Sequence, residues 1–227
     1  MNFQEELSLP FPLRPYQEEG VEFLTSNNSA LLGDDMGLGK TVQTIVALKK
    51  LYKQIGGYRC LIVVPNAVAT NWVREFNIWF PEVHIERVEG NADKRRYQFV
   101  MNQGFLICTY EQTRSMFITT NNYLHYDLVI FDESHRLKNK KSQLHQASSM
   151  IKKNKSWMLS GTPLENNEEE LINIFDILGK NILNTSMSNK EISNKLSNYM
   201  LRRRKEEVLK DLPELIEQDV YIDMTKK

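Results

Sequence analysis

The stretch Asp34-Asp35-Met36-Gly37-Leu38-Gly39-Lys40-Thr41 decides the fold of this chain. It follows an apolar run at residues 30–32 and precedes a helical pattern at residues 41–53. Glycines let a backbone approach an anion closely, and N–H groups at the start of a helix point toward its oxygens. A lysine adds positive charge, and a threonine hydroxyl can reach a metal ion. The strict phosphate-loop spacing is not met, because Asp34 occupies its first glycine position. A glycine-rich turn that caps a core helix is therefore the alternative interpretation.

Short apolar runs alternate with amphipathic segments along the chain. The runs expected to form strands are 30–32, 60–64, 83–88, 105–108, 128–131 and 157–159, and helical patterns cover 41–53, 71–79 and 143–151. Strands of a parallel sheet are buried on both faces and read as continuous hydrophobic runs. The alternation predicts an α/β fold with a mainly parallel β-sheet and helices on both faces.

A pair of acids ends one of these runs, in Leu128-Val129-Ile130-Phe131-Asp132-Glu133. Burying an unpaired charge costs free energy, so two adjacent acids directly after a buried strand indicate a functional role. Asp132 suits a water-mediated Mg²⁺ contact, and Glu133 suits the orientation or deprotonation of an attacking water. A solvated strand end is the alternative.

Two further pieces fit a nucleotide site. Ser160-Gly161-Thr162-Pro163 ends another apolar run, at the sheet edge where ligands bind in α/β folds. A plain turn is the alternative. Gln17 lies upstream of the glycine-rich loop, and its amide can read the donor and acceptor edge of adenine. Its alternative is an exposed residue at a helix start.

Composition places the chain among ordinary soluble globular proteins. Its 227 residues are 41% hydrophobic and 26% charged, with zero formal net charge, so any nucleic-acid contact needs local patches. Its two cysteines lie inside apolar runs, which indicates buried reduced thiols. We find no secretory signal and no run long enough to cross a membrane, and we expect an intracellular protein without a membrane partner.

In order, the motifs resemble the first motor lobe of superfamily-two helicase-like ATPases, most closely the Swi/Snf type. The strings that carry the resemblance are Leu13-Arg14-Pro15-Tyr16-Gln17, the loop 34–41, Val64-Pro65-Asn66, Asn71-Trp72, Thr109-Tyr110, Asp132-Glu133-Ser134-His135, Ser160-Gly161-Thr162-Pro163 and Leu201-Arg202-Arg203. The family also has an acid at the position of Asp34. The resemblance implies a RecA-like phosphate-loop domain that uses ATP and Mg²⁺ and partners double-stranded DNA.

The resemblance also implies residue roles. Lys40, Asp132 and Glu133 would be catalytic, and Thr41 and Asp132 would hold the metal. The remaining assignments are ATP contacts by Gln17, Asp35, Met36, Gly37, Leu38, Gly39, Lys40 and Thr41, coupling of nucleotide state to DNA by His135, Ser160, Gly161 and Thr162, and DNA-backbone contacts by Pro65, Asn66, Thr109 and Tyr110.

The resemblance divides the chain at residue 180. Residues 1–180 are expected to form the ATP-binding lobe, and 181–227 a loop and helix protrusion with a linker toward a second RecA-like lobe. In this family the second lobe closes the ATP cleft and supplies arginines, so the lobe alone should hydrolyse ATP very slowly. A strand-separating helicase, a restriction-type translocase and a non-catalytic nucleotide-dependent docking module stay as alternatives.

Two basic stretches of the sequence each allow two interpretations. Residues 136–155 are rich in lysine and lack an acid, which fits either a nucleic-acid track or a solvated helix face. Arg202-Arg203-Arg204-Lys205 fits either a phosphate contact or a brace between lobes.

Overall fold

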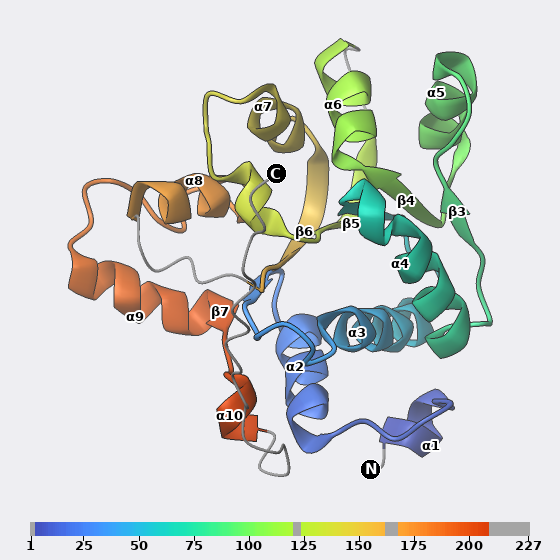
Figure 1. Ribbon diagram of the computed structural model, residues 1–227, viewed down its shortest axis with the longest axis horizontal. Helices are drawn as coiled ribbons and strands as arrows, with labels where there is room; N and C mark the ends of the chain where they lie inside the picture. The colour runs from blue at the N-terminus through green and yellow to red at the C-terminus, as the bar shows by residue number, and fades with distance from the viewer. Residues whose placement is uncertain (1–2, 120–123, 162–167, 209–227) are drawn as a thin grey trace, which may run out of the picture.

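The computed structural model describes residues 3–119, 124–161 and 168–208. Within these ranges the chain forms a seven-stranded sheet in the order β3-β4-β2-β5-β6-β1-β7, with every neighbouring pair parallel (Figure 1). The strands are β1 Ser29–Leu32, β2 Cys60–Val64, β3 Ile85–Arg87, β4 Phe105–Thr109, β5 His125–Phe131, β6 Lys152–Leu159 and β7 Met200–Leu201. The predicted apolar runs are confirmed as the strands of a parallel α/β sheet.

Helices connect the strands and cover both faces of the sheet. They are α1 Phe3–Leu7, α2 Pro15–Ser26, α3 Lys40–Ile55, α4 Asn66–Trp79, α5 Ala92–Met101, α6 Tyr110–Thr119, the 3₁₀ turn η1 Ser134–Leu137, α7 Gln143–Ser149, α8 Glu168–Leu178, α9 Asn189–Tyr199 and α10 Lys205–Val208. None of the helices in the described ranges is both long and apolar enough to span a bilayer.

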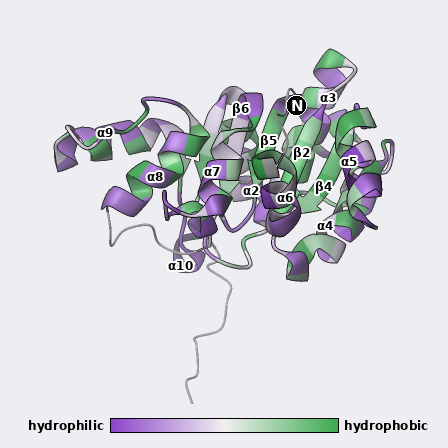
Figure 2. Cartoon of the chain, turned by 90° about the horizontal axis from the view of Figure 1, so that it is seen from above, coloured by the Kyte–Doolittle hydropathy of each residue, from purple (hydrophilic) through white to green (hydrophobic). Residues whose placement is uncertain are grey.

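The core consists of two apolar layers, one on each face of the sheet. Along β2, Ile62 and Val64 join the layer under α2, α3 and α4, while Leu61 and Val63 join the layer under α5 to α9. This alternation follows from the two-residue period of a strand. In Figure 2 the central strands are mostly green, and purple gathers on the outer helices. The thiols Cys60 and Cys108 are free and buried, and burial raises the pKa of each, that of Cys108 to about 12.

The segment after residue 180 returns to the sheet. β7 pairs with β1 through Leu31 and Leu32, and the Gly33 N–H donates to the Leu201 carbonyl at 2.7 Å. Residues 200–203 therefore pack on the ATP-binding lobe expected for residues 1–180. Residues 209–227, the last part of the expected linker, lie outside the described residues.

The topology brings the sequence motifs to one edge. Because all strands are parallel, the loops after β1, β5 and β6 leave the sheet on the same side. β6 lies between β1 and β5, with Leu159 opposite Leu32 and Met158 opposite Phe131. The glycine-rich loop and the acid pair therefore flank Ser160 and Gly161.

Candidate nucleotide site

The glycine-rich loop has a backbone conformation that residues with a Cβ atom rarely adopt. Gly37 and Gly39 have φ values of +87° and +76°, in the left-handed region that glycine occupies without steric cost. A Cβ on Gly39 would lie 2.6 Å from Nε2 of Gln17. The helix α3 begins directly afterwards at Lys40, so its first N–H groups point into the loop. Gln17 thus lies against the phosphate loop, where an adenine-contacting residue is expected.

Lys40 lies between the loop and the acid pair. Its Nζ donates to the carbonyl oxygens of Asp34 at 2.6 Å and Asp35 at 3.1 Å. Burial lowers the pKa of Lys40, and the neighbouring carboxylates, among them Glu133 and Asp132, partly oppose that shift. Neutral carbonyl groups hold the ammonium group, and it interacts electrostatically with the carboxylates of Asp132 and Glu133, as is expected of a phosphate-binding lysine.

Asp132 is held from three directions at the end of β5. The indole Nε1–H of Trp72 donates to its Oδ2 at 2.7 Å, and the Glu133 N–H donates to its Oδ1 at 2.9 Å. The hydroxyl of Tyr110 donates to its carbonyl at 2.6 Å. Asp132 is 9% exposed, and burial raises its pKa despite the Trp72 hydrogen bond. These contacts fix the orientation of the carboxylate.

Glu133 is more accessible than Asp132 and sits in a strained conformation. Its φ and ψ are 51° and 50°, a left-handed geometry that is uncommon outside glycine. Its Oε2 lies 3.2 Å from Nδ1 of His135, a contact without hydrogen-bond alignment. The turn exposes the Glu133 carboxylate beside its buried neighbour, and a water could reach it there.

The loop after β6 completes the site. A Cβ on Gly161 would lie 2.8 Å from Cγ of Met36 and 3.4 Å from Nζ of Lys40. Ser160 next to it is 1% exposed. The predicted coupling residues Ser160 and Gly161 therefore lie against the phosphate loop, and His135 lies against Glu133. Thr162 lies outside the described residues.

The residues present fit ATP and Mg²⁺. The left-handed glycines let the side chains of Lys205 and Gln17 approach the loop closely. Among the described residues, Lys40 hydrogen-bonds to two carbonyl oxygens that a phosphate can replace. Thr41 and Asp132 would offer the metal a hydroxyl and a carboxylate oxygen. In the described ranges no group of three or more His, Cys, Asp or Glu forms a metal cage. Mg²⁺ usually keeps several waters and takes few protein ligands, which the oxygens of Thr41 and Asp132 would supply.

Arg203 is a residue whose role the sequence left open. It is 8% exposed, and its Nε and Nη2 donate to the two carboxylate oxygens of Asp34 at 3.0 and 2.6 Å. Nη2 also donates to Oε1 of Gln43 at 2.9 Å, and Nη1 donates to the Tyr16 carbonyl. A Cβ on Gly20 would overlap the Gln43 amide. Arg203 therefore braces the base of the phosphate loop within this lobe, and Asp34 is its partner.

The four predicted DNA contacts differ in accessibility. Asn66 is exposed, whereas Pro65, Thr109 and Tyr110 are buried. The Thr109 hydroxyl accepts a hydrogen bond from the Gln112 N–H at 3.3 Å. Tyr110 is 0% exposed, so the side chain expected to meet DNA instead holds the Asp132 carbonyl. Of the four side chains, that of Asn66 can meet a ligand without rearrangement.

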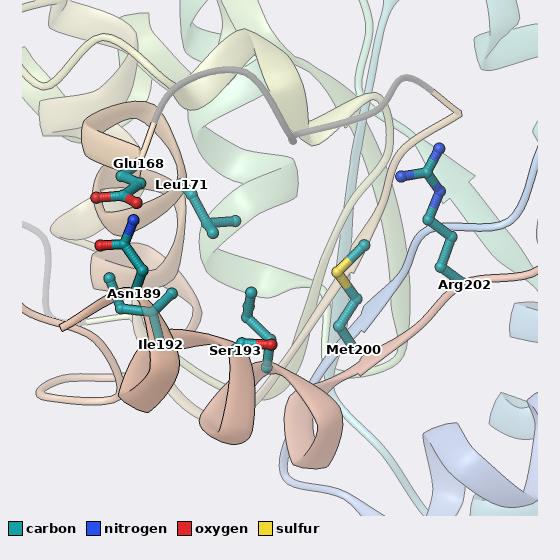
Figure 3. Close-up of a pocket in the computed structure, with 8 residues that line it drawn as sticks. Glu168, Leu171, Asn189, Ile192, Ser193, Met200 and Arg202 are labelled. Carbon is teal, nitrogen blue, oxygen red and sulfur yellow. The ribbon is translucent and has the colours of Figure 1, made fainter. Parts of the chain in front are cut away.

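A hollow of about 320 Å³ lies between α8, α9 and β7 (Figure 3). The picture shows Glu168 and Asn189 at one end and Arg202 at the other, with Ile192 and Met200 among the residues between them. None of the described residues that line it belongs to the glycine-rich loop or to the acid pair. This hollow is therefore distinct from the phosphate site.

The sheet order, the glycine loop and the acid pair define a phosphate-loop nucleotide-binding domain. The SNF2-related domain model matches residues 16–227, and the chain belongs to that family.

Two curated relatives illustrate the match. The chain is 36% identical over 244 residues to the ISWI chromatin-remodeling complex ATPase ISW2 of Saccharomyces cerevisiae, covering 94% of this chain and 21% of the relative. It is 33% identical over 237 residues to an uncharacterized ATP-dependent helicase of Mycoplasma genitalium, covering 95% of this chain and 23% of the relative. The chain thus spans less than a quarter of the length of these relatives.

A solved structure shows the same fold. The Sulfolobus solfataricus SWI2/SNF2 ATPase core in complex with dsDNA superposes with a TM-score of 0.78 at 24% identity. The match covers 90% of this chain and 47% of that chain. The expected RecA-like lobe of the Swi/Snf type is confirmed by the family and the fold.

Proposed function

We propose that this chain is the ATP-binding lobe of a DNA-dependent ATPase that moves along double-stranded DNA. One observation carries the proposal: Lys40 lies on the phosphate loop within electrostatic reach of Asp132 and Glu133, with Gly161 against it. A positive charge, a buried carboxylate and an exposed carboxylate at one sheet edge are the parts that phosphoryl transfer to water needs. The family membership and the relatives' names support the same class of activity.

Each residue has one task in this mechanism. Lys40 exchanges its carbonyl partners for the β- and γ-phosphates of ATP, and Gln17 contacts the adenine. Thr41 and Asp132 would hold Mg²⁺, which would supply positive charge against the charge that develops on the phosphates. Glu133 orients the attacking water and accepts its proton, which its exposure and left-handed turn permit.

DNA and a second RecA-like lobe are the proposed partners. Asn66 is exposed at the start of α4, where a backbone amide or side chain can meet a phosphate without reading base sequence. Ser160, Gly161 and His135 touch the nucleotide site and would report its state to that surface. The proposed setting is inside the cell, where ATP and DNA are available.

The first prediction separates binding from chemistry. Lys40→Met removes the charge that faces the phosphates, so it should weaken ATP binding at least about tenfold, because charge-assisted hydrogen bonds contribute about 1.5–3 kcal/mol each. A fluorescent ATP analogue titrated with Mg²⁺ measures this. Lys53→Met, an exposed lysine near the other end of the same helix, is the matched control and should bind normally.

Glu133→Gln completes that experiment. It should leave nucleotide binding within about twofold, yet reduce turnover of the full-length protein by at least about 100-fold, the contribution expected of a general base. Unchanged turnover in Glu133→Gln and Lys40→Met would favour a nucleotide-dependent docking module instead.

A further inference from the structure

A hollow of about 470 Å³ lies at the other edge of the sheet from the nucleotide site. Its wall includes the starts of β1 and β6 and the ends of α7 and α8. β6 runs from Lys152 in this wall to Leu159 beside the phosphate loop. At about 3.3 Å per strand residue, Leu159 is ~23 Å from Lys152 and ~10 Å from Ser156, the nearest residue of β6 in this wall.

Positive charge dominates this hollow. Lys152, Lys153, Lys155 and Lys180 all line it, while its acid, Asp176, lies 2.9 Å from the Nζ of Lys140 outside the wall. Within the described ranges, Lys153, Lys155 and Lys180 form no ion pair or hydrogen bond through their ammonium groups. The hollow therefore gathers three lysines whose charge no acid among the described residues neutralises.

Lys153 is the most constrained of these lysines. Its side chain is partly buried, with its Nζ 5.9 Å from the centre of the Phe131 ring. Burial, together with the neighbouring charge of Lys180, lowers the pKa of Lys153 to about 8. The Phe131 ring offers a cation–π contact but no counter-charge, so an incoming anion would recover part of the free energy that burial of this ammonium costs.

A hydroxyl in the same wall lacks a partner. Ser156 is 2% exposed, and its Oγ finds no hydrogen-bond partner in the part of the chain that the structure describes. A serine hydroxyl can donate to an anion. Buried polar groups are nearly always hydrogen-bonded, so an orphan beside unpaired lysines indicates a missing acceptor.

Helix ends explain only part of this arrangement. The C-termini of α7 and α8 carry partial negative charge, which favours nearby cations such as Lys152 and Lys180. That attraction needs no recess, and it accounts for neither the burial of Lys153 nor the orphaned Ser156 hydroxyl. A ligand that only accepts hydrogen bonds and carries negative charge accounts for both.

We propose that this hollow binds a small phosphorylated anion, of the size of pyrophosphate, at a site separate from ATP. Its volume falls in the range of small-molecule pockets, about 300–1,000 Å³. A recess suits a compact anion better than the convex backbone of a duplex. The lysines would supply charge, and the Ser156 hydroxyl would donate to a phosphate oxygen.

Calorimetric titration with pyrophosphate at fixed ionic strength tests the proposal. All proteins carry Lys40→Met, so the phosphate loop does not contribute and a failed ATP site cannot be mistaken for a failed second site. We expect one binding event that Lys153→Met and Lys180→Met each weaken at least about tenfold, which corresponds to about 1.4 kcal/mol. Lys190→Met, an exposed lysine on α9, is the matched control and should bind as the parent does.

Additional variants and measurements distinguish the possible outcomes of this titration. Lys180 is exposed, so its variant tests the site even if Lys153→Met fails to fold, which circular dichroism reports. An NMR titration should show pyrophosphate raising the pKa of Lys153 from about 8. Absence of binding, or equal binding by all variants, overturns the proposal. It is also overturned if Lys153→Met weakens binding of a short DNA duplex while pyrophosphate does not bind, since the source of phosphate would then be nucleic acid.

Discussion

Asp132 combines burial with a fixed orientation, and both have a thermodynamic consequence. Its raised pKa means that the folded chain holds this proton more tightly than the unfolded chain does. The sign follows from linkage: ionised Asp132 lowers the free energy of unfolding at neutral pH, and this penalty fades as pH falls through the folded-state pKa. The fold thus holds this carboxylate in an orientation suited to a metal ion, and its burial lowers the free energy of unfolding at neutral pH.

We therefore expect Asp132→Asn to raise the melting temperature of the nucleotide-free chain at pH 7.5. The advantage should shrink by pH 5 and vanish below about pH 3.9, the ordinary pKa of aspartate. Thermal melts across this pH range measure the effect. Asp93→Asn, at an exposed position on α5, should bring no such gain. A lower melting temperature for Asp132→Asn at every pH would mean that the Trp72 hydrogen bond to the charged form outweighs burial.

At the scale of elements, β7 and the residues that follow it hold the phosphate loop in place through hydrogen bonds. The main chain of β7 bonds to Gly33, the Asp35 N–H donates to the Arg203 carbonyl at 3.1 Å, and the Lys205 N–H donates to the Asp35 carboxylate at 3.0 Å. The Arg203 guanidinium pairs with Asp34 beneath the loop. The chain that continues after β7 therefore starts beside the nucleotide site. Such a position would let a change at that site reach the following segment directly.

Arg203→Ala should lower the free energy of unfolding by about 3–5 kcal/mol, because it leaves the carboxylate of Asp34 buried and unpaired. Denaturant unfolding of the chain measures this. Arg204→Ala removes an exposed arginine next to it and should change stability by less than about 0.5 kcal/mol. The double variant, Asp34→Asn with Arg203→Ala, should lose less stability than the sum of Asp34→Asn and Arg203→Ala measured singly. Additive losses would contradict a direct pair.

The sequence predicted the elements that local pattern determines and missed those that depend on distant partners. The strands β1 to β4 and the ends of β5 and β6 follow from apolar runs, and the helix after Gly39 follows from its amphipathic pattern. The apolar runs do not predict the polar starts of β5 and β6, residues 125–127 and 152–156, and residues 152–155 fall in the basic stretch. β7 has two residues, too short for a periodic pattern, and Arg203 meets an acid 169 positions away. Likewise, nothing local to Trp72 or Tyr110 indicates that their polar atoms hold Asp132. Such pairings are fixed by the packed sheet, not by neighbours in sequence.

At the scale of the whole molecule, we expect the nucleotide site to form one side of a cleft that a second lobe closes. Arg203 is committed to Asp34, so it cannot also neutralise charge on a transferring phosphate. An arginine supplied from elsewhere contributes about 10³–10⁵-fold to the rate in related phosphoryl-transfer enzymes. Since the chain spans less than a quarter of the relatives above, we expect such an arginine to come from a second lobe.

This leads to a prediction about turnover. The 227-residue chain should bind ATP yet hydrolyse it at least about 10³-fold more slowly than the full-length protein with duplex DNA, and DNA should stimulate the chain little. A coupled phosphate-release assay compares the two, with Glu133→Gln as the background control for contaminating ATPases. Robust DNA-stimulated turnover by the chain alone would place the missing charge within this lobe. If the full-length protein also displaces a strand from a duplex, the motor is a strand-separating helicase and not a duplex translocase.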